Sequence, residues 1–481
     1  MAILILGSCF ALFLPIGAGL DEPMHIARVE QLAEGYFLPQ EIECDGLNTT
    51  LVSPASNEYP IYGGETDSAL FELLVRGNRA FYGNRGRSGY LFPTWDDPDL
   101  QINSEMGEDT TKWLFPNTSI NSIASYLPQT IAYAFISTFI SNPVIVVLFV
   151  RLAGVVSFAA ATMACMRILP FGRIVVAFVA LLPVSLSTMS VVTADTMTFV
   201  FVSLFISCII KLLYSDEPSC VIWITLGVSL AGVCLAKITY VPLGLLLLAL
   251  PLAKSCYRSR QNIVKIGIIG GGSLILFILW YLQIHDVNTG IMWSSEINPD
   301  VQKAIVLDQP VIFIKAAAKT LFNTDLLTLS PSIPYGSIIN SSWMTVIPLT
   351  VVMLSLSKEM AIVANLGKRP RAVLAVFLFA LIALVISLIY LALYLQFTPP
   401  GAGEVSGIQT RYFSPIQIPG YIALILLVSI VTGANGAECP ADSKIHRSSG
   451  STVLVGGQAV AYIAVLLMGL LTTVSFLICL F

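Results

Sequence analysis

The chain has 481 residues, of which 56% are hydrophobic and 11% are charged, and its mean hydropathy is +0.82. This composition excludes a soluble globular domain, and a formal net charge of −4 gives no reason to expect nucleic acid as a partner. Runs of about 20 apolar residues predict helices that cross a lipid bilayer, because every backbone group in lipid must be hydrogen-bonded within its own segment. We therefore expect an all-α integral membrane protein, a polytopic helical bundle.

The hydrophobic runs predict about eleven transmembrane helices. In chain order they lie near 2–20, 143–168, 172–190, 194–214, 219–236, 239–253, 263–283, 343–364, 372–395, 413–433 and 453–480. The first run lacks the basic leader and cleavage site of a secretory signal, so we expect it to be retained, with a cleaved signal as the alternative. The segment 120–140 is interrupted by Pro128 and is expected to be a juxtamembrane or re-entrant helix.

Two connections between the predicted spans, 21–142 and 284–342, are too long to be turns. The first contains aromatic residues and amphipathic stretches, which predict a small extracytoplasmic cap with juxtamembrane helices. The chain then divides into a first transmembrane helix, the cap, helices two to seven, a second extracytoplasmic loop and helices eight to eleven. These parts span residues 1–20, 21–142, 143–283, 284–342 and 343–481.

Lys and Arg concentrate in alternate short connections, above all in 254–265 and 368–371. An excess of basic residues in short loops is typical of the cytoplasmic side of a membrane. The eleven-span count satisfies this rule at every inner loop. It predicts a multi-pass plasma-membrane protein with a cytoplasmic N-terminus and both long loops outside.

With this topology, charged and polar residues from distant parts of the chain meet at the extracytoplasmic rim. They are Asp21, Glu22, His25, Arg28, Asp195, Lys237, Arg411 and Tyr412. Ionisable groups at membrane depth are costly and are retained mainly where they pair with each other or bind something charged. Lys237 and Arg411 would hold a phosphate by charge-assisted hydrogen bonds, and a carboxylate at the entrance would take a proton from an incoming hydroxyl.

Each of these residues also has a purely structural interpretation. Lys237 could be a snorkelling anchor, and Asp195 could be the N-cap of its helix. Asp21 and Glu22 could favourably charge the start of a helix. Arg151 lies well inside the second predicted span, where it would support either a carrier site or a transport path.

Six short motifs, in this order, resemble a bacterial family of predicted multispanning membrane proteins, the domain of unknown function DUF2142. The motifs are Asp21-Glu22-Pro23-x-His25, Tyr126-Leu127-Pro128-Gln129, Arg151-Leu152, the segment 190–195, Ala236-Lys237-x-x-Tyr240-x-Pro242 and Gln409-x-Arg411-Tyr412-Phe413-x-Pro415. The likeness covers nearly the whole chain, and that family resembles the GT-C superfamily of membrane glycosyltransferases. This sequence departs from a typical GT-C enzyme in its modest outer domain.

The resemblance implies a GT-C-like transferase that moves a sugar from a polyprenyl-phosphate donor to a glycan or glycolipid acceptor outside the cell. In GT-C proteins an acidic residue just after the first helix serves as base or helps to bind a divalent metal, which implies Asp21 here, with Glu22 as the second candidate. Mg²⁺ or Mn²⁺ at Asp21 is optional, because adjacent residues of a regular helix cannot both face one ion. The residues implied around the donor phosphate and lipid are His25, Arg28, Arg151, Asp195, Lys237, Tyr240, Gln409, Arg411 and Tyr412.

Two other functions remain as alternatives, a transporter or flippase of lipid-linked sugars and a non-catalytic scaffold. Transporters place charges and broken helices near the midplane, whereas most charges here lie at the outer ends of the spans. Four aromatic residues of the outer loops could stack on sugar rings, although aromatics at this depth more often anchor a protein in the interface. They are Tyr90, Trp95, Trp113 and Tyr335.

Overall fold

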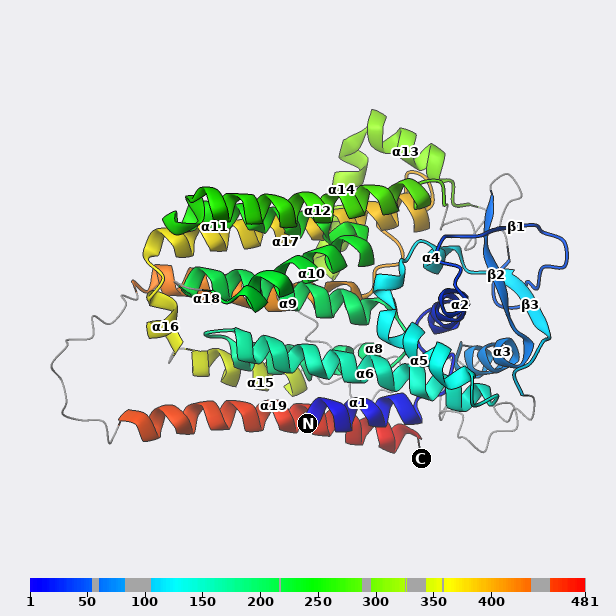
Figure 1. The fold of residues 1–481 in the computed structure, drawn as a ribbon, viewed down its shortest axis with the longest axis horizontal. Helices are drawn as coiled ribbons and strands as arrows, with labels where there is room; N and C mark the ends of the chain where they lie inside the picture. Colours follow the sequence, from blue (N-terminus) through cyan, green and yellow to red (C-terminus); the bar gives the residue numbers. More distant parts are fainter. Residues whose placement is uncertain are drawn as a thin grey trace.

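The computed structural model describes residues 1–53, 60–82, 105–215, 218–287, 296–324, 326, 343–356, 359–433 and 450–480. Long helices run side by side as a bundle, and a cap made of strands and shorter helices covers one end of it (Figure 1). We call this the cap end. The cap contains α2 (Glu22–Ala33), β1 (Glu41–Ile42), β2 (Ile61–Asp67), α3 (Ser68–Tyr82), β3 (Thr110–Leu114), α4 (Pro116–Ser119), η1 (Ile123–Ser125) and α5 (Leu127–Ser137).

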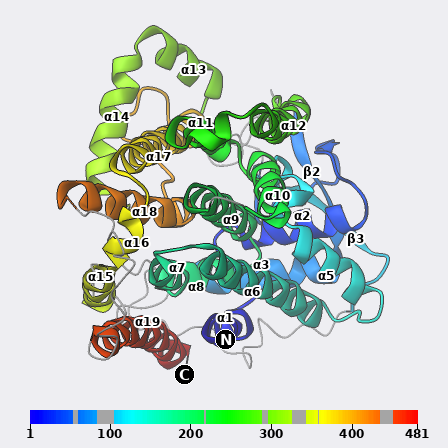
Figure 2. The ribbon, with the colours of Figure 1, turned by 60° about the vertical axis from the view of Figure 1, so that its left-hand side comes forward.

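The remaining helices form the bundle, from which one short helix, Pro299–Asp308, projects (Figure 1). They are α1 (Ala2–Phe13), α6 (Pro143–Ile168), α7 (Arg173–Ala180), α8 (Pro183–Met189), α9 (Ala194–Tyr214), α10 (Cys220–Ala236), η2 (Ile238–Leu248), α11 (Ala249–Ala253), η3 (Ser255–Arg258), α12 (Arg260–Ile284), α13 (Pro299–Asp308), α14 (Pro310–Asn323), α15 (Trp343–Leu356), α16 (Met360–Ala364), α17 (Lys368–Phe397), η5 (Thr410–Phe413), α18 (Ser414–Val431) and α19 (Gly450–Leu480). Helix α9 lies at the centre and packs against α6, α10 and α18 (Figure 2).

Five helical segments in the described part of the chain are long and apolar enough to cross a membrane. They are α6, α9, α12, α17 and Thr410–Val431, which joins η5 to α18. Four shorter apolar helical segments accompany them, and all eleven predicted spans fall on helical segments. The prediction of a helical membrane protein is confirmed, whereas eleven crossings remain a prediction.

Two of the predicted spans are interrupted where proline removes a backbone donor. The span at 172–190 is divided into α7 and α8, because Pro183 cannot donate to the preceding turn and forces Leu182 into an extended conformation. The span at 239–253 begins as the 3₁₀ helix η2, which contains Pro242. Both breaks lie in the bundle, where the freed backbone groups need other partners.

The first helix is shorter than the predicted span 2–20. It ends at Phe13, where Leu14 becomes extended and Pro15 follows. The last carbonyl groups of α1 therefore have no partner within the helix. The chain from Leu14 to Asp21 is irregular, and it leads directly into the site described below.

The cap contains a three-stranded antiparallel sheet in the order β1-β2-β3, so the all-α prediction is wrong for this part of the chain. In the register Gly63 faces Leu114, and a Cβ at Gly63 would lie 2.2 Å from the Trp113 carbonyl oxygen. Glycine is required there by the close approach of two backbones. Glycine also has a low strand propensity, which is why the sequence of β2 does not read as a strand.

Helix α2 is almost wholly buried between the sheet and α5, and it carries a buried acid, Glu30. The Oε1 atom of Glu30 accepts hydrogen bonds from the backbone N–H of Asp67 (3.1 Å) and from the hydroxyl of Tyr133 (2.8 Å). Burial raises the pKa of Glu30 from its ordinary value of 4.5 to about 7. The folded cap therefore favours the protonated carboxyl.

Replacing Glu30 with glutamine is expected to stabilise the protein at pH 8 and to have little effect at pH 5. Because the pKa is higher in the folded state, stability falls as the pH rises from about 4.5 to about 7. The neutral amide avoids this loss, which is on the order of 3 kcal/mol above pH 7. Melting temperatures across this pH range test the effect. Glu65→Gln, at an exposed acid of β2, is the matched control, and equal pH profiles for Glu30→Gln and the native protein would contradict the prediction.

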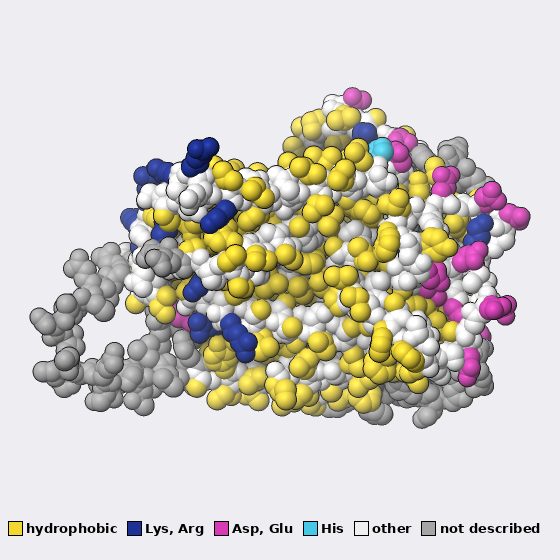
Figure 3. Space-filling model, viewed as in Figure 1, with side chains coloured by type: hydrophobic (Ala, Val, Ile, Leu, Met, Phe, Trp, Pro, Cys, Tyr) yellow, Lys and Arg dark blue, Asp and Glu magenta, His cyan; other side chains and the backbone are white. Residues whose placement is uncertain are grey.

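Charge is distributed unevenly along the bundle (Figure 3). A broad hydrophobic band separates an end rich in Lys and Arg from the cap end, where Asp and Glu are frequent. The basic end contains the connections from α11 to α12 and from α16 to α17. This separation agrees with the charge pattern that predicts a cytoplasmic basic end, and the orientation itself remains a prediction.

Candidate functional site

A cavity of about 580 Å³ lies at the cap end of the bundle. The outer parts of α12 and α17 supply an apolar wall that includes Trp280, Ile284, Ile389, Leu393 and Phe397. The opposite side is polar and is formed by residues from the start of α2, the start of α9, the end of α10 and η5. Seven predicted site residues line the cavity: Asp21, His25, Asp195, Lys237, Gln409, Arg411 and Tyr412.

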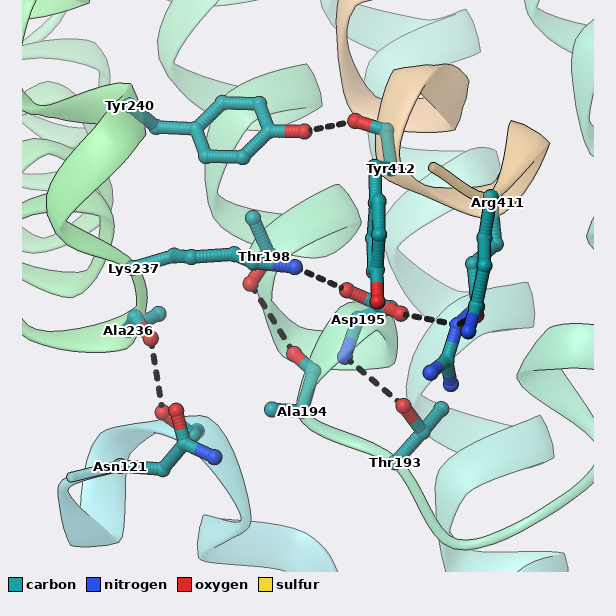
Figure 4. Close-up of polar contacts among 12 residues, drawn as sticks. Asn121, Thr193, Ala194, Asp195, Thr198, Ala236, Lys237, Tyr240, Arg411 and Tyr412 are labelled. Atoms are coloured by element: carbon teal, nitrogen blue, oxygen red, sulfur yellow. Dashed lines mark hydrogen bonds and ion pairs between the residues drawn. The ribbon is translucent and has the colours of Figure 1, made fainter. Parts of the chain in front are cut away.

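Asp195 connects two cationic residues from different parts of the chain. Its Oδ1 atom lies 2.7 Å from the Nζ atom of Lys237, and its Oδ2 atom lies 3.6 Å from the Nε atom of Arg411 (Figure 4). Asp195 is not the N-cap of α9, because Thr193 holds that position and its hydroxyl accepts from the Asp195 N–H. The carboxylate is thus directed into the ion cluster.

Lys237 follows the last residue of α10 and points into the cavity. Its Nζ atom lies 4.6 Å from the centre of the Tyr412 ring, in addition to its ion pair with Asp195. A snorkelling anchor would extend towards the lipid headgroups, so that alternative does not describe this side chain. The Tyr240 hydroxyl donates to the Tyr412 carbonyl oxygen. Tyr240 does not line the cavity, and it holds η5 in place.

Arg411 connects the ion cluster to the segment after α1. Its Nη2 atom lies 2.5 Å from Asp21 Oδ2, and its Nη1 atom donates to the Leu20 carbonyl oxygen at 3.0 Å. Its Nε atom donates to Gln409 Oε1 at 2.6 Å. Asp21 and Asp195 thus balance Lys237 and Arg411.

The backbone of Asp21 has an unusual conformation. Its φ angle is 59°, and among the described residues it is the only non-glycine residue with a positive φ. Such conformations cost roughly 1–3 kcal/mol and often mark functional sites. The turn places the Asp21 carboxylate, whose side chain is 22% exposed, on the cavity and directs Glu22 away from it.

Glu22 and Arg151 do not reach the cavity, which differs from the roles predicted for them. Arg151 donates two hydrogen bonds to the carboxylate of Glu22, at 2.7 and 2.6 Å, and both side chains are fully buried. Three further bonds satisfy carbonyl oxygens at the end of α1, those of Ala11, Leu14 and Pro15. Together these use all five N–H groups of the guanidinium, so none is left for a phosphate.

The carboxylate oxygens of Glu22 are likewise fully occupied by hydrogen bonds within the protein. Besides Arg151, it accepts hydrogen bonds from the backbone N–H groups of Gly17, Gly19 and Val192. The pair therefore connects the end of α1, the start of α2, α6 and the segment before α9. A carboxylate with these partners supports the fold and cannot serve as a base for a ligand in the cavity.

Arg28 also has a structural position, one turn beyond His25. Its guanidinium donates to the carbonyl oxygens of Tyr36, Phe37 and Asn121 and to the side chain of Gln31. Burial lowers its pKa to about 10. Arg28 thus fixes the loop after α2, and its predicted contact with the donor is not supported by this geometry.

His25 lines the cavity and contacts Tyr126, with 2.5 Å between Nδ1 and the hydroxyl oxygen. Tyr126 belongs to a motif quoted from the sequence, although no role was predicted for it. The apolar wall from α12 and α17 was not predicted either. In the sequence, this wall is indicated only by the Trp280-Tyr281 pair near the end of a predicted span, and such a pair is equally typical of an interfacial anchor.

Trp113 does not act as a sugar platform. It is fully buried in the cap, where it makes edge contacts with Phe71 and Phe115 and donates from Nε1 to Thr66 Oγ1 at 2.9 Å. The other three aromatic residues considered for sugar stacking, Tyr90, Trp95 and Tyr335, lie outside the described residues.

A divalent metal does not fit the observed arrangement at Asp21. The guanidinium of Arg411 lies between the carboxylates of Asp21 and Asp195, where a metal ion would have to bind. Within the described ranges, no group of three or more His, Cys, Asp or Glu side chains is placed to hold a metal ion. The Mg²⁺ or Mn²⁺ that the resemblance leaves optional at Asp21 therefore has no support in this geometry.

Comparison with known proteins identifies a family. The family model described as "Predicted membrane protein (DUF2142)" matches residues 4–419. No curated protein and no solved structure matches the chain. The matched range includes the ion cluster, both walls of the cavity and the Glu22–Arg151 pair.

Proposed function

We propose that this chain, which belongs to the DUF2142 family of predicted membrane proteins, is a glycosyltransferase that moves a sugar from a polyprenyl-phosphate donor to a glycan or glycolipid acceptor. One observation carries the proposal: a single cavity joins an apolar wall to two cations and two carboxylates. A lipid with a phosphate headgroup needs both kinds of surface side by side. The orientation inferred from the basic loops assigns the reaction to the extracytoplasmic side.

In this proposal the two cations hold the donor phosphate, and the apolar wall holds the first part of its lipid chain. Lys237 supplies a flexible point charge, whereas Arg411 supplies a planar guanidinium suited to paired contacts with phosphate oxygens. Ile389, Leu393 and Phe397 lie on the side of α17 that lines the cavity. This arrangement orients the sugar towards the polar side, where Asp21 lies.

Asp21 acts as the general base. It takes the proton of an acceptor hydroxyl as that oxygen forms a bond to the anomeric carbon of the sugar. The bond between the anomeric carbon and the phosphate oxygen breaks, and the phosphate leaves with the electron pair. Lys237 and Arg411 stabilise the negative charge that develops on the phosphate, and the proton remains on Asp21 until the product departs.

The transporter alternative rested on Arg151, the one charge well inside a predicted span. Because Arg151 is paired with Glu22 and with the end of α1, its position has a structural explanation. A non-catalytic scaffold would also retain the Glu22–Arg151 pair, because that pair supports the fold. The ion cluster on the cavity does not follow from a scaffold role, so it favours a site that binds a ligand.

Purified protein in lipid nanodiscs or vesicles, supplied with a panel of radiolabelled polyprenyl-phosphate sugars, tests the proposal. We expect release of polyprenyl phosphate, with the sugar transferred to added glycan or to water. Lys237→Met is expected to reduce the rate by roughly 10²-fold or more, since it removes one phosphate contact. Lys319→Met is the matched control, because Lys319 pairs with Glu404 on the surface. Translocation without turnover would instead support the transporter, and neither activity would support the scaffold.

A further inference from the structure

Three side chains at the edge of the cavity form a directed hydrogen-bond chain. The Nδ2 atom of Asn121 donates to the hydroxyl oxygen of Tyr126 at 2.9 Å, and that oxygen lies 2.5 Å from Nδ1 of His25. The amide nitrogen can only donate, so the Tyr126 oxygen accepts from Asn121. The single hydroxyl proton of Tyr126 is then directed at His25, whose Nδ1 must be the acceptor.

This direction determines which nitrogen of His25 carries the proton. A neutral imidazole that accepts at Nδ1 is protonated at Nε2. His25 lines the cavity, and no hydrogen bond joins Nε2 to any residue that the structure describes. The ring therefore has one nitrogen bound within the protein and one N–H group without a protein partner.

The surroundings of His25 disfavour a second proton. Tyr126 is fully buried and His25 is 8% exposed. Burial, together with the positive charge of Arg411, lowers the pKa of His25 to about 4, and Lys237 acts in the same direction. Asp21 and Asp195 act in the opposite direction but do not offset these effects. A proton on Nδ1 would also leave the Tyr126 hydroxyl without an acceptor.

We propose that His25 contacts the ligand as a neutral Nε2–H donor, and that Asn121 and Tyr126 are positioning residues that fix this tautomer. The partner is an acceptor oxygen, either of the donor phosphate or of its sugar, so this inference rests on the proposed function. A nitrogen that already carries a proton cannot accept another. His25 is therefore excluded as the general base, and that role is left to Asp21.

The tautomer can be measured without any enzyme assay. The chain contains three histidines, His25, His285 and His446, so ¹⁵N labelling of histidine gives three ring systems, and the His25 signals are those absent from His25→Gln. We expect His25 to be neutral, protonated at Nε2, and not to titrate between pH 5 and 8. An Nδ1–H tautomer or an imidazolium at pH 7 would overturn the proposal.

Two variants test the direction of the hydrogen-bond chain. Asn121→Asp replaces the amide donor with an acceptor, so Tyr126 should donate to the new carboxylate and His25 should change to the Nδ1–H form. Tyr126→Phe should give a mixture of tautomers and raise the pKa of His25 by up to about one unit, since a neutral hydrogen bond is lost. Tyr133→Phe is the matched control, because this buried tyrosine bonds to Glu30 and not to His25. An unchanged tautomer in both variants contradicts the assigned positioning roles.

Addition of a short-chain isoprenyl phosphate and, separately, of the same lipid phosphate carrying a sugar tests the contact with the ligand, because the acceptor oxygen belongs to one of these two groups. We expect the Nε2 signal of His25 to shift, with no change in tautomer. If the protein turns over the donor but this signal does not shift, the inference about His25 fails and the proposed function stands. If the tautomer is as expected but there is neither turnover nor a shift, the proposed function fails and only the hydrogen-bond chain remains.

Discussion

Asp21→Asn is expected to reduce sugar transfer by roughly 10²–10⁴-fold, the usual contribution of a general base, while leaving the protein folded. Asparagine has nearly the same shape as aspartate and tolerates the left-handed conformation that Asp21 adopts. Its amide oxygen can still accept a hydrogen bond from Arg411, but it cannot take a proton from the acceptor hydroxyl. Initial rates with the best radiolabelled donor, together with the melting temperature, measure both effects.

Asp21→Gly separates the effect of losing the carboxylate from the effect of the strained backbone at this position. Glycine relieves the strain of a positive φ, so this variant should be at least as well folded as Asp21→Asn but equally inactive. Asp67→Asn, at a cap acid that caps α3 with its Oδ1 atom, is a control for loss of a carboxylate elsewhere. Full activity in Asp21→Asn would exclude Asp21 as the base.

Arg151→Met is expected to destabilise the protein by about 3–5 kcal/mol, which is typical when one partner of a buried ion pair is removed. The variant leaves the carboxylate of Glu22 buried without its counterion and leaves three carbonyl oxygens at the end of α1 without donors. Unfolding by heat or denaturant in detergent measures the loss. If the variant is not recovered folded, Glu22→Gln provides a milder test, because glutamine keeps one acceptor oxygen.

The double variant Glu22→Gln/Arg151→Met distinguishes a pair from two independent residues. Its destabilisation should be smaller than the sum of the two single effects, since no unpaired charge remains. Lys319→Met serves as the surface control, because exposed ion pairs contribute little. Normal stability in Arg151→Met, combined with weaker donor binding, would contradict the structural role and restore the one predicted from the sequence.

Most of the helical architecture could be predicted from the sequence, because a long apolar run in lipid has few other ways to satisfy its backbone. The limits of individual helices were less predictable. Pro183 and Pro242 are visible signals for breaks, yet proline is also found in continuous transmembrane helices, so neither residue predicts a break by itself. The sheet of the cap was missed because β2 contains Gly63 and Gly64 in place of the alternating apolar residues of a typical strand.

The location of the site followed from topology, since alternate helix ends meet at one rim. What each charged side chain does there depends on details that a sequence pattern does not contain. Asp21 and Glu22 are neighbours, but one left-handed residue places the first on the cavity and the second in the core. The two arginines differ in a similar way. Arg151 is held in the core because three carbonyl oxygens, left over where α1 ends early, accept its hydrogen bonds. Arg411 pairs with Asp21 instead and lines the cavity.

Lys237 and Arg411 already have Asp195 and Asp21 as counterions before any donor arrives. In the proposed reaction, entry of the donor phosphate is thus an exchange of partners, and the affinity for the donor reflects the difference between two sets of contacts. We expect the affinity for the donor to be modest. We also expect the polyprenyl phosphate product to dissociate readily, because the ion pairs of Lys237 with Asp195 and of Arg411 with Asp21 form again. In the proposed reaction the same exchange releases Asp21 from Arg411 only when a donor is in place, so its carboxylate is available at the moment when there is a sugar to transfer.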